Sequence, residues 1–341
     1  MPKLPKVKVY FNSTLHHFSQ LLAGLEYLST KNEIELKYAL DLGKYPIDIF
    51  KIEYNGLKLF FDMADNSRIY DKIYEESDFY VKRMLLKTDY NSRKRLIPYG
   101  LYYPVYFRNS YLKYLFLQNK DLAKYSIKYW AWASKFLKIK DSIAVNEISK
   151  LESEPSHYDK IVFRARLWNP DNNKENWKKK ERKVLNAERI AINRIFTEQF
   201  ENSFKGGILK DNYSEKICPD ILLPEKHYHR KVYLEELRNA SIGIANQGLE
   251  DSIGAKFGEY IANSMAIVTS PIDKFKLHGD FEENVHYLTY HSSEECLQLT
   301  KRLFENEPLR KGMQFANLEY YQNYLHPANK MMHIFNLISR S

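Results

Sequence analysis

The stretch Gly243-Ile-Ala-Asn-Gln-Gly-Leu-Glu250-Asp-Ser-Ile-Gly-Ala-Lys256-Phe-Gly-Glu259-Tyr-Ile-Ala-Asn-Ser-Met-Ala-Ile-Val-Thr-Ser-Pro271 decides the expected fold of this chain. An apolar run at 242–245 has the length and composition of a buried strand, and a second apolar run follows at 266–269. A glycine-containing loop and a segment of helical character from Lys256 separate the two runs. The pattern predicts a strand–loop–helix–strand unit, the crossover that joins neighbouring strands of a parallel sheet.

Charged side chains fall where this unit would bind a ligand. Parallel α/β sheets bind ligands in the loops that follow the carboxyl ends of their strands. Free N–H groups at the start of the helix favour phosphate, and Lys256 adds a positive charge there. Glu259 is three residues further on, so it can share a face with Lys256 and accept hydrogen bonds from sugar hydroxyls. An ordinary surface helix with a Lys/Glu pair is the alternative at this point.

The first half of the chain also alternates strands and helices. Asn55-Gly56 lies between two apolar runs and predicts a hairpin, and Asp65-Asn66-Ser67 predicts the cap of a helix that reaches Glu76. The expected strands are 7–11, 34–38, 47–52, 57–61 and 77–83, the expected helices are 18–28 and an aromatic stretch at 111–136, and 95–105 is expected to be a loop.

The second half repeats the alternation. Strands are expected at 160–167 and 286–290, a short strand or a turn at 206–209, and helices at 177–200, 227–239, 296–304, 308–325 and 329–337. The whole pattern predicts an α/β protein with two Rossmann-like parallel-sheet domains that face one another across a cleft. We place the first domain at 1–150 and the second at 151–325, with a final helix at 326–341 that could return to the first domain.

Composition narrows the class of protein. A chain of 341 residues with 44% hydrophobic residues can form two globular domains. The net charge of +9 implies an anionic partner, which could be nucleic acid, an anionic membrane surface or a phosphorylated substrate. Two distant cysteines, Cys218 and Cys296, fit a reducing compartment. The absence of a signal-like or membrane-spanning apolar run predicts a cytoplasmic protein.

Several common signatures are missing from the sequence. We find no Walker-type loop, no dinucleotide-binding glycine fingerprint after the first strand and no nucleophile elbow. The histidine pairs lack partners at metal-ligand spacing, so we expect no metal site and no cofactor. What remains at the strand ends of the second half is Arg164, Arg166, Lys256 and Glu259, with Arg189 on the long helix. Arginines beside a lysine and a helix start are suited to a diphosphate.

Segments in the second half of the sequence resemble a known family of enzymes. Glu250-Asp251-x-x-Gly254-x-Lys256-Phe-Gly-Glu259-Tyr-Ile-Ala-x-x-x-Ala-Ile-Val resembles the donor-binding segment of glycosyltransferases with the GT-B fold. Two later segments are similar to the tails of bacterial family-1-like sugar transferases, namely Asn284-Val-His-Tyr-Leu-Thr-Tyr290 with Ser293-Glu-Glu295, and Met313-x-x-Ala-Asn-x-x-Tyr-Tyr-x-x-Tyr324-Leu-x-Pro327. The resemblance covers roughly residues 160 to 330.

The resemblance implies a metal-independent enzyme that needs no cofactor and uses a nucleotide-sugar co-substrate, with a hexose or related sugar as the transferred group. Glu259 matches the carboxylate that touches the donor ribose, and Lys256 matches a basic position at the donor phosphates, where Arg166 would join it. The first acidic position of the family pattern is Asp251 here, with Glu250 beside it. The family pattern has Glu at that position, so the departure leaves the stereochemistry of transfer open.

An inverting transfer needs a general base, which would lie on the first domain. Among His16, His17, Asp62, Asp65 and Asp78 we favour Asp65 and His17. The acceptor would be a polysaccharide, glycan or glycolipid, and the basic, aromatic first domain could meet the anionic inner face of the cell membrane. The alternatives are a nucleic-acid-binding protein, suggested by charge and aromatic content, and a non-catalytic sugar-binding relative.

Overall fold

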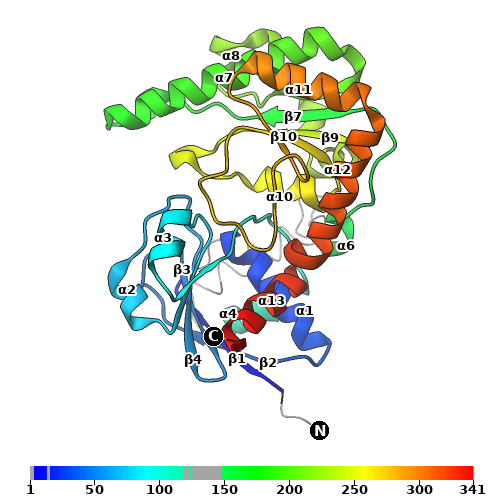
Figure 1. Cartoon of the computed structure of the whole chain (residues 1–341). Helices are drawn as coiled ribbons and strands as arrows, with labels where there is room; N and C mark the ends of the chain where they lie inside the picture. Colours follow the sequence, from blue (N-terminus) through cyan, green and yellow to red (C-terminus); the bar gives the residue numbers. More distant parts are fainter. Residues whose placement is uncertain (1–3, 14–15, 109, 119–122, 124–146, 341) are drawn as a thin grey trace. The chain divides into compact units, whose positions relative to one another are not determined.

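The chain forms two compact α/β units, each with its own sheet. The computed structural model describes residues 4–13, 16–108, 110–118, 123 and 147–340 (Figure 1). Unit 1 comprises residues 1–151, 274–280 and 322–341, and unit 2 comprises residues 152–273 and 281–321. The prediction of an α/β protein with two sheets is confirmed. That the units face one another across a cleft stays a prediction.

The sheet of unit 1 is mixed, where the sequence predicts a parallel one. Its strands are β1 (Lys6–Phe11), β2 (Glu35–Leu40), β3 (Ile49–Tyr54), β4 (Leu57–Asp62), β5 (Phe79–Lys82) and β6 (Leu96–Pro98), in the order β2-β1-β3-β4-β5-β6. β3 runs antiparallel to both β1 and β4. The cause is the predicted hairpin, since Asn55 and Gly56 adopt φ of +49° and +90° and a two-residue turn can join only antiparallel strands. β6 also lies inside the segment predicted to be a loop.

Helices cover the sheet of unit 1. They are α1 (Ser19–Thr30), α2 (Asp71–Glu76), α3 (Lys87–Ser92), α4 (Ser110–Gln118), α6 (Ile148–Leu151) and α13 (Pro327–Arg340), and the short η1 (His16–Phe18) precedes α1. α1 packs closely on α13, because a Cβ at Gly24 would collide with the backbone of Pro327. The buried Lys330 on α13 donates to the carbonyl oxygens of Tyr99, at 3.0 Å, and of Leu101. The C-terminal helix is thereby fastened to the exit of β6.

Two helix predictions in unit 1 are not fully matched by the structure, one in its cap and one because most of it lies outside the described residues. α2 begins at Asp71 with Tyr70 at its N-cap, and no side chain caps it, so the predicted cap at Asp65-Asn66-Ser67 is wrong. The carboxylate of Asp65 instead pairs with Arg83. Of the predicted aromatic helix at 111–136, only α4 and residue 123 lie within the described residues.

Unit 2 has a parallel sheet throughout. Its strands are β7 (Ile161–Ala165), β8 (Phe204–Ile208), β9 (Ile242–Ala245), β10 (Ala266–Thr269) and β11 (Leu288–Thr289), in the order β11-β10-β9-β7-β8. Every pairing is parallel, and β9 and β10 have the bounds predicted from the two apolar runs. Such a sheet carries helices on both faces, which is why its strands are apolar almost throughout.

The helices of unit 2 are α7 (Asn176–Phe200), α8 (Ser214–Ile217), α9 (Arg230–Arg238), α10 (Ala255–Ala262), α11 (Ser293–Glu305) and α12 (Glu307–Tyr320). Short turns link them: η4 (Pro170–Asn172), η5 (Glu201–Ser203), η6 (Pro219–Ile221), η7 (Glu225–His227) and η8 (Leu249–Asp251), with the π-turn η9 (Tyr321–Leu325) after α12. Ser292 caps α11 by accepting from the N–H of Glu295, as its sequence predicts. Within the described residues, no helix combines the length and the apolar content that crossing a bilayer requires.

The strand order of unit 2 fixes where a ligand would bind. β7 is the first strand, β8 pairs with one side of it and β9 with the other. The chain therefore leaves β7 in one direction and later returns to its opposite side. In open parallel sheets this switch point opens a crevice between the two loops at the carboxyl edge. The loops concerned follow β7 and β9, and they carry Arg166 and the segment before Lys256.

Candidate functional site

A buried arginine ties together the two loops at the switch point. Arg189 on α7 is 5% exposed, and its guanidinium donates to the carbonyl oxygen of Arg166 at 2.7 Å and of Gln247 at 2.9 Å. It also donates to Oδ1 of Asn246 at 3.2 Å and lies 4.0 Å from the centre of the Trp168 ring. Burial lowers its pKa from the usual value to about 10. Arg189 thus points at the sheet edge and holds the loops after β7 and β9 in fixed positions.

Lys256 lies among arginines. Its ammonium group donates to the carbonyl oxygen of Arg164, on β7. The pKa of Lys256 is lowered to about 7, first by burial and then by the guanidinium groups of Arg189, Arg164 and Arg166, against the opposing effect of Glu259. Collecting like charges in this way costs free energy unless an anion joins them. The cluster therefore has electrostatics that favour the binding of an anion.

Two of these cations form no ion pair with a carboxylate of the described residues. Within the part of the chain that the structure describes, no ion pair holds Arg166 or Lys256. Arg166 is exposed beyond the end of β7, and Lys256 lies in the first turn of α10, whose N-cap Gly254 has no capping side chain. Free N–H groups at that helix start add to the positive potential. Both residues were predicted to bind donor phosphates, and in the structure Arg166 is close enough to Lys256 to lower its pKa.

Glu259 is held by α9. It is 4% exposed, and its carboxylate accepts from Arg230 at 2.5 Å and from the hydroxyl of Tyr233 at 2.9 Å. Glu259 and Lys256 do lie one turn apart on α10, as predicted. Arg230 and Tyr233 were not predicted as part of the site. Their spacing of three residues on a helix was the available signal, because it places both on one face.

A second network lies beneath the first. The guanidinium of Arg164 pairs with the carboxylate of Glu236 on α9 and donates to the carbonyl oxygen of His227 at 2.7 Å. The other carboxylate oxygen of Glu236 contacts Nδ1 of His227. Burial lowers the pKa of both Arg164 and His227. The side chain of Arg164 is therefore used in internal contacts, whereas Arg166, just after β7, is exposed.

The acidic residues Glu250 and Asp251 project from η8. Both are exposed, with φ of +57° and +58°, in the left-handed region that non-glycine residues seldom adopt. The N–H of Glu250 donates to the carboxylate of Glu181 on α7 at 2.5 Å, which stabilises this turn. Their predicted role in donor binding stays a prediction.

The two favoured base candidates, Asp65 and His17, are both in unit 1. Asp65 is half exposed and its carboxylate accepts from Nη1 of Arg83 at 2.5 Å. The Arg83 guanidinium lies 5.2 Å from the centre of the Tyr102 ring, and the His17 ring lies 5.6 Å from the same ring. Because Arg83 is 3% exposed, the pair offers one outward face, that of Asp65. Asp65 and His17 are thus connected only indirectly in the contacts described, through Arg83 and Tyr102, and their role as a base stays a prediction.

The other carboxylates considered as bases are poorly placed. Asp62 and Lys82 are fully buried and paired at 3.0 Å, and the Tyr80 hydroxyl donates to Asp62 at 2.5 Å. Asp78 precedes β5 and accepts from the N–H of Lys58 at 2.6 Å, so it lies at the amino edge of the sheet. His16 begins η1. Among the described residues, no group of three or more His, Cys, Asp or Glu side chains could hold a metal ion.

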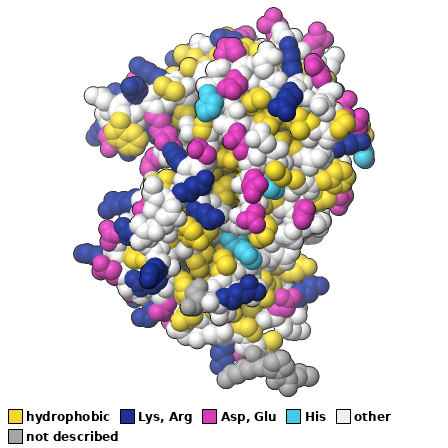
Figure 2. Space-filling model, in the orientation of Figure 1, with side chains coloured by type: hydrophobic (Ala, Val, Ile, Leu, Met, Phe, Trp, Pro, Cys, Tyr) yellow, Lys and Arg dark blue, Asp and Glu magenta, His cyan; other side chains and the backbone are white. Residues whose placement is uncertain are grey.

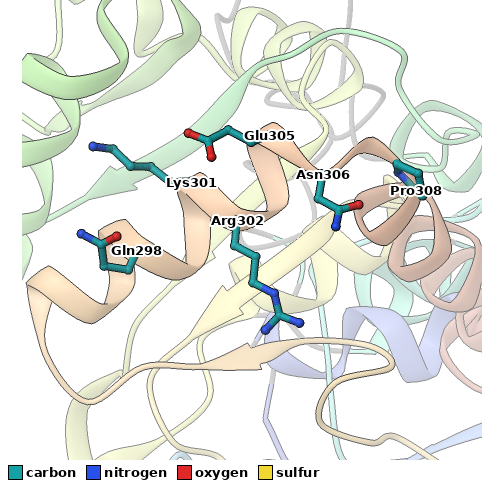
Figure 3. A pocket seen from close by; sticks show the side chains of 6 residues that line it. All are labelled: Gln298, Lys301, Arg302, Glu305, Asn306 and Pro308. Atoms are coloured by element: carbon teal, nitrogen blue, oxygen red, sulfur yellow. The ribbon is translucent and has the colours of Figure 1, made fainter.

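An open hollow of about 610 Å³ lies elsewhere on unit 2 (Figure 3). Its walls come from the last turns of α11 and the start of α12, and the side chains that line it are Gln298, Lys301, Arg302, Glu305, Asn306 and Pro308. α11 begins at the carboxyl end of β11, so its last turn lies toward the amino edge of the sheet. This hollow is therefore separate from the crevice at the switch point.

Comparisons with known proteins give a loose structural likeness. No protein-family model matches the chain, and no curated protein matches it as a relative. Among solved structures it is similar to the C-terminal domain of a glycosyl transferase group 1 family protein (LpcC) from Francisella tularensis, with a TM-score of 0.35, 10% identity, and coverage of 50% of this chain and 88% of that one. It is also similar to a glycosyltransferase from Rickettsia africae (0.40, 11%, 93% and 74%) and to WaaG, a glycosyltransferase involved in lipopolysaccharide biosynthesis (0.38, 10%, 91% and 79%). TM-scores below 0.5 are too low to assign a fold or an activity.

Proposed function

We propose that this protein is a glycosyltransferase that binds a nucleotide-sugar donor in the crevice of unit 2 and transfers the sugar to a glycan or lipid-linked acceptor without a metal ion. One observation carries the proposal. Lys256 and Arg166 meet at the switch point of a parallel sheet with no carboxylate partner among the described residues, beside the buried guanidinium of Arg189. A diphosphate would complete this set of charges.

The positive charges of the crevice are suited to stabilise a diphosphate as it leaves the sugar. When an acceptor oxygen attacks the anomeric carbon, the bond from that carbon to the phosphate oxygen breaks and negative charge grows on the diphosphate. Lys256 and Arg166 would stabilise that charge, which is the service that a metal ion provides in other transferases. The neighbouring Glu259 carboxylate would accept hydrogen bonds from the donor ribose, and the resemblance of the segment from Glu250 to Val268 supports a sugar nucleotide over other diphosphates.

The acceptor side of the proposal belongs to unit 1. An inverting reaction needs a base that takes the proton of the acceptor hydroxyl, and His17 and Asp65 are our candidates. His17→Gln and Asp65→Asn should each lower kcat while leaving the affinity for the nucleotide unchanged. If neither substitution changes kcat, the base lies elsewhere, and the donor site in unit 2 is unaffected by that result.

Thermal shifts with nucleotide sugars test the donor site. A ligand at 100 times its Kd stabilises a protein by about 2.7 kcal/mol, so UDP-, GDP-, CMP- and TDP-sugars can be ranked by the rise in Tm. Arg166→Gln should remove most of that rise, because it deletes an exposed cation and disturbs no internal contact of its side chain. Lys231→Met, at a lysine 79% exposed on α9, is the matched control and should leave the rise intact.

The thermal shift, together with assays of nucleic-acid binding and donor hydrolysis, separates the alternatives. A nucleic-acid-binding protein would show salt-sensitive binding to DNA or RNA and no shift with any nucleotide sugar. A non-catalytic sugar-binding relative would show the shift but neither donor hydrolysis nor transfer. Donor hydrolysis that is lost in Arg166→Gln, in a variant that folds, is the result that the proposal requires.

A further inference from the structure

The first turns of α7 extend beyond the core of unit 2. The first buried residue of this helix is Leu185, so nine helical residues precede the core, a length of about 13 Å. Figure 1 shows α7 as the long green helix at the margin of its unit. We call residues 174–184 the projecting end of α7. It is joined to the crevice, because Glu181 accepts from the N–H of Glu250 in η8.

Two large apolar side chains are exposed on the projecting end. Trp177 is 53% exposed and Val184 is 61% exposed. They are seven residues apart, which places them on the same side of a helix, and Lys180 lies between them on that side. Leu185 and Arg189 are buried and lie on other sides of the helix than this one. The outward face therefore combines an indole ring, an aliphatic group and an ammonium group.

The projecting end is strongly basic. Residues 174–184 contain six basic and two acidic side chains, a net charge of +4. Both acidic groups are engaged, since Glu175 pairs with Lys178 and Glu181 pairs with Arg182. In the described parts of the chain, no ion pair involves the four remaining lysines, Lys174, Lys179, Lys180 and Lys183. Figure 2 shows Lys and Arg side chains beside hydrophobic ones over this end of α7, at the upper left.

We propose that the projecting end of α7 docks on the surface of an anionic lipid bilayer. Trp177 and Val184 would enter the interface between headgroups and acyl chains, while the lysines would meet the lipid phosphates. Indole rings favour this interface because one end of the ring is apolar and the other donates a hydrogen bond. Nucleic acid would also attract the lysines, but it offers no apolar environment to Val184. The combination of charges with an aliphatic side chain therefore selects the bilayer.

The proposal does not depend on the identity of the reaction. It does have a consequence for it, because Glu181 links the docked helix to the loop of Glu250 and so to the mouth of the crevice. A bilayer bound by α7 would lie beside the site where we place the donor. The inference thus favours an acceptor that is itself carried by a lipid.

Vesicle co-sedimentation of the full chain tests the proposal. We expect binding to vesicles of phosphatidylcholine mixed with phosphatidylglycerol, and much weaker binding to phosphatidylcholine alone. Lys180→Gln combined with Lys183→Gln should lower the partition coefficient roughly 25-fold, since each lysine near an anionic surface contributes about a factor of five. Trp177→Ser should also lower it, whereas Trp177→Phe should retain binding and lose the blue shift of tryptophan emission that vesicles cause.

A matched control lies on α12 of the same unit. Phe315 is 58% exposed there and Lys311 is on the same helix. Phe315→Ser combined with Lys311→Gln removes one aromatic ring and one positive charge, as Trp177→Ser combined with Lys180→Gln does, and it should leave vesicle binding unchanged. Urea unfolding of both double variants should match that of the unaltered protein, because all four side chains are at the surface.

Three results would overturn the proposal. The first is vesicle binding that is the same in Trp177→Ser/Lys180→Gln, on α7, as in Phe315→Ser/Lys311→Gln, on α12. The second is equal binding to zwitterionic and anionic vesicles. The third is displacement of the protein from vesicles by an RNA duplex, with RNA binding that falls in the lysine variant but not in Trp177→Ser. The thermal shift with nucleotide sugars is measured without lipid, so failure of the docking surface and failure of the proposed function give different results.

Discussion

Lys256→Met should make the ligand-free protein more stable and remove its stabilisation by nucleotide sugar. The pKa of Lys256 falls from 10.5 to about 7, chiefly through burial. At 1.36 kcal/mol for each unit of pKa, keeping this ammonium group in the folded protein at pH 7 costs about 4 kcal/mol. Methionine has a similar volume and no charge, so it removes that cost. It also leaves the carbonyl oxygen of Arg164 without its donor, which costs about 1–3 kcal/mol. The expected net gain is about 1–3 kcal/mol.

The sign of the pH dependence follows from the direction of the shift. Because the pKa is lower in the folded protein, the unfolded chain holds a proton between pH 7 and 10.5 that the folded protein has lost. The cost is therefore fully present below pH 7 and disappears as the pH rises toward 10.5. At pH 9.5 it should be only about 1.4 kcal/mol, by the same 1.36 kcal/mol per unit. The advantage of Lys256→Met at pH 7 should accordingly vanish at pH 9.5.

Urea unfolding at pH 7 and pH 9.5, with and without nucleotide sugar, measures both effects. Lys256→Met should have the higher midpoint at pH 7 without ligand and should gain nothing from the ligand that stabilises the unaltered protein. The exposed Lys231→Met should match the unaltered protein within about 0.5 kcal/mol at both pH values. A variant that is less stable at pH 7, or one whose stability follows the same pH curve as the unaltered protein, would show that Lys256 is not a strained cation.

Three further predictions concern ionisable side chains in the interior of the two units. Arg189→Met should cost about 2–4 kcal/mol in urea unfolding and abolish nucleotide binding, because its guanidinium donates to both loops, after β7 and after β9. Asp62→Asn should cost about 3–5 kcal/mol by leaving the buried Lys82 unpaired, and combining it with Lys82→Met should recover part of that loss. Burial lowers the pKa of His326 to about 4 and also lowers that of His278, so the unfolded chain alone binds these protons below pH 6.5 and stability should fall with decreasing pH. For His326 the loss at pH 5 is about 2 kcal/mol, and His326→Gln should flatten the curve by that amount.

The unit from β9 to β10 was predictable because local signals agree there. Both apolar runs are short and end at polar or turn residues, and a parallel pair joined by a helix needs no other information. In unit 1 the sequence identified the hairpin at Asn55-Gly56 but not its effect on the rest of the sheet. The antiparallel pairing of β1 with β3 joins Val7 to Tyr54, and such distant pairings leave no local mark on the sequence.

The cap predicted at Asp65 shows how a local signal can fail. Asp-Asn-Ser is a typical capping sequence, yet α2 starts only at Asp71. Asp65 instead pairs with Arg83, 18 positions further along the chain, where β5 has just ended beside β4. The carboxylate satisfies a nearly buried guanidinium, and that demand outweighs the gain from capping one exposed helix.

The candidate site was predictable in its charges but not in its internal contacts. Lys256 and Arg166 follow strand ends, and strand ends meet at one edge of a parallel sheet. The carbonyl contact of Lys256 and the partners of Glu259 depend on how α9 and α10 pack, which spacing along the chain does not reveal. Arg189 could be placed on the long helix, but whether it faced the sheet or solvent was open until the fold was known.

The contacts of Glu259 change how its part in donor binding should be understood. An ionised carboxylate has about four acceptor positions, and Arg230 and Tyr233 fill two of them. If the donor binds as we propose, the hydroxyls of a ribose would use acceptor positions other than these two, and neither internal contact would have to break. Those partners also fix the orientation of the carboxylate before a ligand arrives, so binding does not have to order that side chain. Since Glu259 is 4% exposed, little of its carboxylate is open to a ligand that stays at the surface. Burial thus lowers the pKa of Lys256 and also limits the access of ligands to the Glu259 carboxylate. Both effects follow from the packing of α9 and α10 around the end of β7.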